Sequence, residues 1–193
     1  MTRDNLSTRV SDAQSGATYT YDAAGQRTSS VVTHGSTTTT TTYTYEGLTL
    51  LALEAAASDG TTSSVTYLSD APGCPYGGVY SSSESSPVAF GIVTTDRGDV
   101  VELTDSQGEP FARYAYDAYG TPTATESRAT GALDADLASA IDGASVLRYA
   151  SYCYDGFSGL YYLSQRYLDP ATASFITKDP AKADGEVELP RSR

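Results

Sequence analysis

A pair of tyrosines separated by one residue recurs along this 193-residue chain at a fixed interval. The steps from Tyr19 to Tyr43 and from Tyr43 to Tyr67 are both 24 residues, and the same spacing then leads near Phe90 and on to Tyr114. The first copy reads YTYDAAGQR, and the copy at Tyr114 reads YAYDAYG. A period of this length indicates a repeat array, in which each unit is stable only beside its neighbours.

Each unit is predicted to be one β-hairpin. Tyr19 and Tyr21, two positions apart, would lie on the same face of a strand, and Asp22 with Gly25 would supply the turn. A threonine-rich polar strand would follow. Because an isolated hairpin is marginal in water, the units are expected to lie side by side in an extended antiparallel sheet, which makes the fold class all-β.

The charge and the apolar pattern exclude several classes of partner. A formal net charge of −12 disfavours nucleic acid and anionic membranes, whose phosphates would repel the chain. We find neither a signal-peptide core after Met1 nor an apolar run long enough to span a bilayer, so membrane insertion is not expected. Export would then depend on a feature outside this chain or on a pathway that reads no cleavable signal.

Three segments are ambiguous. Residues 36–42, a serine and six threonines, suit an exposed strand or a disordered linker, and we favour the strand. Residues 48–57 (LTLLALEAAA) suit a short helix or the returning strand of a hairpin, and their position favours the strand. Residues 70–87 are predicted to be a loop from their prolines, glycines and serines.

Residues 121–148 look least like the repeat. Leu133, Leu137 and Ile141 follow helical spacing, and Gly143 comes next, which predicts one short amphipathic helix near residues 132–142 on the outside of the sheet.

Residues 149–180 are predicted to form a three-stranded meander. Tyr152 and Tyr154 alternate along an extended run that a turn at residues 155–159 ends. Residues 160–168 would form the second strand, and a short third strand would begin at Phe175.

This last stretch resembles the repeat-associated core of the RHS/YD-repeat family, whose pattern runs roughly Y-x-G-x-x-x-D-x-x-T-G-L-Y-Y-L-x-x-R-Y-Y-D-P-x-T-G-R-F-x-x-x-D-P. The positions that match are Tyr149, Asp155, Gly159, Leu160, Tyr161, Tyr162, Leu163, Arg166, Tyr167, Asp169, Pro170, Thr172, Phe175, Asp179 and Pro180. The 24-residue units are similar to the YD repeats of the same family. Residues 95–120 resemble a second recurring signature of the family, with Asp99 in place of its serine.

The sequence departs from the family pattern in the meander. Ser151 replaces a glycine, Ser158 a threonine and Leu168 a tyrosine, while Ala173 and Ser174 replace Gly-Arg. Alanine adopts positive φ less readily than glycine, so the turn after residue 169 is expected to differ in type.

The resemblance implies a segment of a curved, hollow β-shell. We expect a hairpin array at residues 1–120, an insert with a short helix at 121–148, the core meander at 149–180 and a flexible tail at 181–193. With only about five units, the chain is too short to close a cavity. It is therefore expected to be a fragment, a truncated reading frame or a piece that docks on another array. Expected partners are other YD-repeat segments or a second copy, through exposed sheet edges, and a polypeptide toxin cargo.

The function that the resemblance implies is a non-catalytic part of a shell that encloses and delivers a C-terminal toxin in competition between bacteria. The chain would then be secreted or at the cell surface as part of a larger protein. Two alternatives stay open: an adhesion module that binds carbohydrate through tyrosine-rich faces, and a residual self-cleaving aspartyl protease core.

We assign no catalytic, cofactor-binding or metal-binding residue. His34 has no second histidine or cysteine nearby and is read as a surface residue. Cys74 and Cys153 are read as unpaired, with a disulfide as the alternative. The helix aspartates are expected to form a solvated face rather than a metal site; they are Asp134, Asp136 and Asp142.

Two aspartates before proline are the remaining candidates for chemistry. Asp169 and Asp179 are read as residues that end strands and start turns, with a proton-sharing dyad as the alternative. The family implicates aspartates of two spaced D-P-x-G motifs in self-cleavage, and Asp179 matches the first. Here Ala181 and Lys182 follow instead, and no second motif is present, so self-cleavage by this chain alone is not expected.

Overall fold

The structure, a computed structural model, describes residues 8–12, 15–71 and 74–176. Within these residues the chain forms an 11-stranded sheet, a four-stranded sheet and one α-helix. The large sheet consists of β1 (Thr8–Asp12), β2 (Ser15–Tyr21), β3 (Arg27–His34), β4 (Thr37–Glu46), β5 (Thr49–Ala57), β6 (Thr62–Ala71), β7 (Cys74–Ser82), β8 (Ser85–Thr94), β9 (Val100–Thr104), β10 (Pro110–Tyr116) and β11 (Pro122–Ser127). The predicted all-β class is confirmed.

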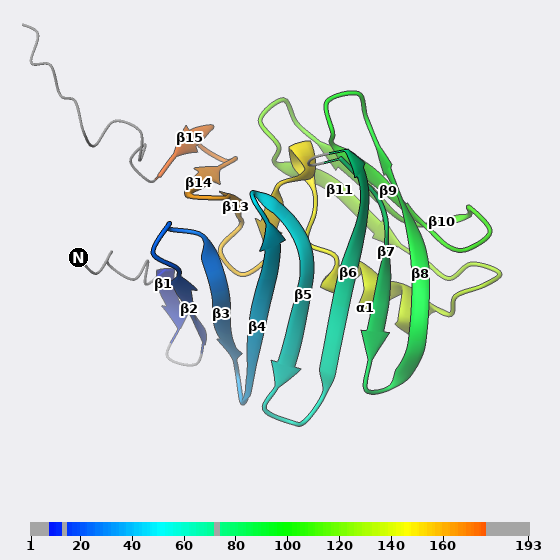
Figure 1. Ribbon diagram of the computed structural model, residues 1–193, viewed down its shortest axis with the longest axis horizontal. Helices are drawn as coiled ribbons and strands as arrows, with labels where there is room; N and C mark the ends of the chain where they lie inside the picture. Colours follow the sequence, from blue (N-terminus) through cyan, green and yellow to red (C-terminus); the bar gives the residue numbers. More distant parts are fainter. Residues whose placement is uncertain (1–7, 13–14, 72–73, 177–193) are drawn as a thin grey trace, which may run out of the picture.

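Every strand of the large sheet pairs antiparallel with the next strand along the chain, so the sheet is a succession of hairpins. The ribbon runs from β1 past β8 and then curls back through β9 to β11 (Figure 1). Both strand interpretations of ambiguous segments are confirmed: β4 contains the threonine tract and β5 the run of leucines and alanines.

In the first and last copies of the repeat, the acidic residue and the glycine make the turn, as predicted. In the first copy the backbone N–H of Gly25 donates to the carbonyl of Asp22 (3.0 Å), and Gly25 has a φ of +84°. The Asp22 carboxylate accepts from the backbone N–H of Gln26 at 2.8 Å. The same pattern recurs at Asp117, whose carboxylate accepts from the backbone of Thr121 at 2.9 Å. Thus these two turns are closed by backbone and side chain together.

The tyrosines face the core. Tyr19, Tyr67 and Tyr114 are buried, whereas the residues beside them on their strands are exposed. Helix α1 (Ala135–Ala144) lies against this inner face, where Ala138 and Ile141 are fully buried.

The prediction that the helix lies on the outside of the sheet is wrong. Helix α1 contacts β6, β10 and β11, and β6 is separated from β10 by three strands. Strands lie about 4.8 Å apart and a helix is about 10 Å wide, so one helix reaches both only if the sheet curves around it. The helix therefore fills the concave side, behind the sheet in Figure 1.

The prediction of a loop over residues 70–87 is also wrong, because β7 and the start of β8 lie there. Its glycines allow close packing inside the sheet. A Cβ at Gly77 would lie 2.8 Å from the carbonyl oxygen of Phe90, and a Cβ at Gly78 would lie 2.6 Å from the ring of Phe90. These glycines mark a close approach of neighbours rather than a loop.

The meander has four strands instead of three. They are β12 (Cys153–Asp155), β13 (Leu160–Leu163), β14 (Arg166–Asp169) and β15 (Ser174–Phe175), and a 3₁₀ turn, Tyr149–Ser151, precedes them. Residues 160–168 do not run as one strand, because a tight turn at Ser164 and Gln165 folds β14 back onto β13. Ser164 has a φ of +58°, a conformation that its residue type does not signal.

Strand β11 lies within the residues expected to form the insert and adds a strand to the large sheet. The expected tail at 181–193 lies outside the described residues. Among the described residues, we find no helix with the length and apolar character needed to cross a membrane.

Candidate functional site at the junction of the two sheets

The small sheet, β12 to β15, joins the first and last repeats of the large one. Tyr161 and Tyr162 are neighbours on β13, so their side chains point to opposite faces. The Tyr161 hydroxyl donates to the carbonyl of Gly120 at 2.8 Å. The Tyr162 hydroxyl accepts from the backbone N–H of Arg27 at 2.7 Å. Gly120 closes the turn of the last copy and Arg27 follows the turn of the first. The dipeptide Tyr161-Tyr162 is therefore hydrogen-bonded to both the first and the last copy of the repeat.

Further bonds follow the same two paths. The Gln165 side chain donates to the carbonyl of Ala24 at 2.9 Å, in the turn of the first copy. The Thr121 hydroxyl donates to the carbonyl of Pro170 at 3.3 Å, which ties the last copy to the end of β14. The Tyr21 and Tyr167 hydroxyls share a hydrogen bond of 2.9 Å.

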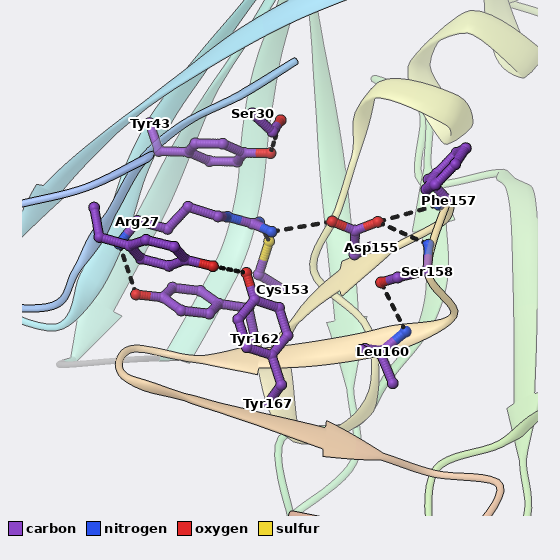
Figure 2. Close-up of polar contacts among 11 residues, drawn as sticks. Arg27, Ser30, Tyr43, Cys153, Asp155, Phe157, Ser158, Leu160, Tyr162 and Tyr167 are labelled. Atoms are coloured by element: carbon purple, nitrogen blue, oxygen red, sulfur yellow. Dashed lines mark hydrogen bonds and ion pairs between the residues drawn. The ribbon is translucent and has the colours of Figure 1, made fainter. Parts of the chain in front are cut away.

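The Arg27 side chain lies at the centre of this junction and is fully buried. Its Nη1 lies 3.1 Å from Asp155 Oδ2, and its Nη2 lies 2.9 Å from Cys153 Sγ. Its guanidinium carbon lies 4.3 Å from the ring centroid of Tyr43 and 4.8 Å from that of Tyr162. Figure 2 shows the guanidinium between these rings, reaching across from the first hairpin to the small sheet.

The cluster holds a buried positive charge against one carboxylate. Asp155 also accepts from the backbone N–H groups of Phe157 (3.2 Å) and Ser158 (3.0 Å), so both carboxylate oxygens have partners. Burial opposes the charge on Arg27, but the neighbouring Cys153, Tyr43, Tyr167 and Asp155 outweigh it and raise the pKa of the guanidinium. Hydrogen bonds and aromatic rings therefore compensate most of the buried charged pair, while Arg27 Nε has no hydrogen-bond partner among the described residues.

The thiol and phenol groups of the cluster stay protonated at neutral pH. Burial raises the pKa of the Cys153 thiol, although Arg27 acts to lower it. Burial also raises the pKa of Tyr43 and of Tyr162 to about 12. These three groups therefore keep their protons at pH 7, and the arrangement is suited to holding two sheets together.

The predicted readings of the lone histidine and the cysteines are confirmed. His34 is exposed at the end of β3. Cys74 is exposed, Cys153 is buried, and both are free. No group of three or more possible metal ligands occurs in the part of the chain that the structure describes.

The helix aspartates divide into two kinds. Asp134 caps the helix, since its carboxylate accepts from the backbone N–H of Leu137 at 2.8 Å, and Asp136 is exposed in the first turn. Asp142 does not belong to the solvated face: it forms an ion pair of 3.1 Å with Arg148, and its carboxylate accepts a 2.5 Å hydrogen bond from Tyr114. The prediction is wrong for Asp142 because the helix lies inside the curve of the sheet, where this face meets the core.

Asp169 is confirmed as a turn residue. Its carboxylate accepts from the backbone N–H of Ala171 at 3.0 Å and from the Thr172 hydroxyl at 2.9 Å. Asp179 lies outside the described residues, as does any dyad that it would form.

Sequence reasoning missed Arg27 as a central residue. The signal was available, because Arg27 ends the first repeat motif and pairs with Tyr21 across the hairpin, a register that turns its side chain to the same face as the tyrosines. Its partner, Asp155, could not be predicted from the sequence, since 128 residues separate the two positions.

Comparison with solved structures gives close matches over almost the whole chain. The crystal structure of TcdB2-TccC3 matches with a TM-score of 0.71 at 21% identity, covering 94% of this chain and 9% of that one. The crystal structure of TcdB2-TccC3-TEV matches with a TM-score of 0.71 at 20% identity, covering 94% of this chain and 8% of that one. The chain has an RHS-like fold.

Curated proteins of similar sequence also match almost the whole chain. The tRNA3(Ser)-specific nuclease WapA of Bacillus spizizenii is 36% identical over 180 residues, and the tRNA nuclease WapA of Bacillus subtilis is 35% identical over 180 residues. Both alignments cover 92% of this chain, which spans only 7% of the length of these relatives. No family model matches the sequence.

Proposed function

We propose that this chain is a non-catalytic wall segment of an RHS/YD-repeat shell that encloses a polypeptide toxin and delivers it in competition between bacteria. The observation that carries the proposal is the junction: Tyr161 and Tyr162 bond to the last and first repeats, which keeps the large sheet curved. A wall that encloses a cargo needs a fixed curvature. The likeness in fold to TcdB2-TccC3 supports the same role.

Under this proposal, the nuclease activity in the names of the relatives belongs to a region of those proteins that this chain does not match. The chain corresponds to 7% of those proteins, and its net charge of −12 would repel the phosphates of a tRNA. The thiol and phenol groups at the junction keep their protons at neutral pH, which suits a structural role.

The partners that we propose are further YD hairpins. Strands β1 and β11 are the first and last of the large sheet, and each pairs with one strand within the described residues. Unpaired strand edges recruit other strands, so additional hairpins or a second copy would continue the sheet there, and the curved face would meet the cargo. We further propose that the chain acts at the cell surface or outside the cell, as part of a larger protein.

A chimera tests the proposal. The matching 180 residues of Bacillus subtilis WapA are replaced by this chain, and tRNA nuclease activity is measured after treatment with protease. A wall segment is expected to keep the activity protected from digestion. The same chimera with Arg27→Met is expected to lose the protection, whereas Arg113→Gln, at an exposed ion pair, keeps it.

Two results would refute the proposed role. One is a chimera that loses its activity to protease as fast as a WapA from which the 180 residues are deleted. The other is cleavage of tRNA by the isolated chain, which would place the catalyst here.

A further inference from the structure

An open groove with apolar side chains lies at the rim of the large sheet, and two of its lining residues, Thr49 and Ser69, also line a pocket beside the junction. It has a volume of about 550 Å³ and is lined by residues of β4 to β7. Leu68 is 40% exposed and Tyr76 is 53% exposed, although both are large apolar side chains. Leu68 follows the buried Tyr67 on β6, so it points to the face opposite the core.

Two carboxylates stand beside this apolar surface without a matching positive charge. Glu46 and Asp70 both line the groove and are exposed, and none of its lining residues is lysine or arginine. Neither carboxylate takes part in the ion pairs found among the described residues. The net charge of −12 extends the negative field beyond the groove and would draw a cationic partner toward it.

We propose that this groove binds a cationic polypeptide segment. An apolar side chain of that segment would lie between Leu68 and Tyr76, and basic side chains on either side of it would pair with Glu46 and Asp70. Tyrosine is a frequent anchor in protein interfaces, because it buries a large area and keeps a polar end. The two carboxylates disfavour anionic ligands. The proposal does not depend on the shell role, because it rests on the groove alone.

Fluorescein-labelled peptides test the pairing. An eight-residue peptide of alternating arginine and leucine is titrated into the intact chain, and binding is followed by anisotropy up to about 1 mM protein. The double variant Glu46→Gln/Asp70→Asn is expected to bind roughly 2- to 30-fold more weakly, from two exposed ion pairs. The control Glu84→Gln/Glu126→Gln has the same net charge, changes exposed residues outside the groove and is expected to bind like the parent.

The apolar contact is tested with a second variant and a matched control variant. Tyr76→Ser is expected to weaken binding at least about fivefold, whereas Tyr119→Ser, which removes an exposed tyrosine outside the groove, leaves it unchanged. A peptide of alternating arginine and serine is expected to bind more weakly than the arginine-leucine peptide. Far-UV circular dichroism checks that each variant is folded.

Three outcomes overturn the inference: no binding of the arginine-leucine peptide, equal weakening by the two charge-matched double variants, and equal affinity for the arginine-leucine and arginine-serine peptides. The last two would show attraction to the net charge of the chain without a site.

Discussion

Replacing Arg27 by methionine is expected to destabilise the fold more than any other single loss of charge among the described residues. The change removes the ion pair with Asp155 and the ring contacts with Tyr43 and Tyr162. It also leaves the Asp155 carboxylate buried with only its two backbone donors. Breaking a buried pair by removing one partner costs about 3–5 kcal/mol, a large share of the 5–15 kcal/mol by which a typical domain is stable.

Urea unfolding followed by far-UV circular dichroism measures the loss, with tyrosine fluorescence as a second probe because the chain has no tryptophan. Arg113→Gln is the control, since Arg113 forms an ion pair with Glu102 and its side chain is 52% exposed; a loss below about 1 kcal/mol is expected.

The double variant Arg27→Met/Asp155→Asn distinguishes the contribution of the Arg27–Asp155 ion pair to stability from that of side-chain packing. Asparagine keeps an oxygen for the two backbone donors and removes the uncompensated charge, so the double variant is expected to lose less stability than the two single variants summed. Additive losses, or a loss below about 1 kcal/mol for Arg27→Met, would show that the buried pair does not hold the sheets together.

Three further changes test other parts of the structure. Ala173→Gly is expected to raise the free energy of unfolding in urea by about 1 kcal/mol, because Ala173 has a φ of +53°. A lowered free energy of unfolding would contradict this. Gly77→Ala is expected to cost about 1–3 kcal/mol by the same measurement, since its Cβ would meet a backbone oxygen, whereas Gly16→Ala has open space; equal losses would refute the packing argument. The stability of the fold is expected to fall as pH rises from about 10 to 12. The tyrosines of the unfolded chain ionise near pH 10.0, whereas burial in the folded chain holds the pKa of Tyr43 and of Tyr162 at about 12. A thermal midpoint that stays constant over that range would disprove this prediction.

The repeat could be read from the sequence because its signals are local. A tyrosine pair, an acidic residue and a glycine at fixed spacing determine a hairpin, and the turn at Asp22 and Gly25 forms as this pattern predicts. The same reasoning failed where the decisive neighbour is remote. Gly77 and Gly78 resemble loop residues until the Phe90 strand is placed beside them.

The meander shows a second limit. Residues 160–168 contain no glycine, proline, asparagine or aspartate that would signal a turn, yet the chain reverses at Ser164. Two departures from the family pattern, Ser151 and Ala173, have φ of +56° and +53° where the family has glycine. At both positions the backbone is left-handed although the residue is not glycine. The surrounding contacts therefore offset the conformational strain of a serine or an alanine at positive φ. The Ser151 hydroxyl, for instance, donates to the carbonyl of Gly98 at 2.8 Å.

Two turn aspartates, Asp105 and Asp155, show how a local turn can also hold distant parts of the chain. A carboxylate has two oxygens, and closing the turn uses one of them. In Asp105 the second oxygen accepts from the Thr130 hydroxyl, and in Asp155 it binds Arg27. Substituting asparagine at either position would keep the turn and weaken only the long-range contact. At Asp105 and Asp155, therefore, one carboxylate oxygen closes a local turn and the other contacts a remote residue, which the sequence around the turn cannot reveal.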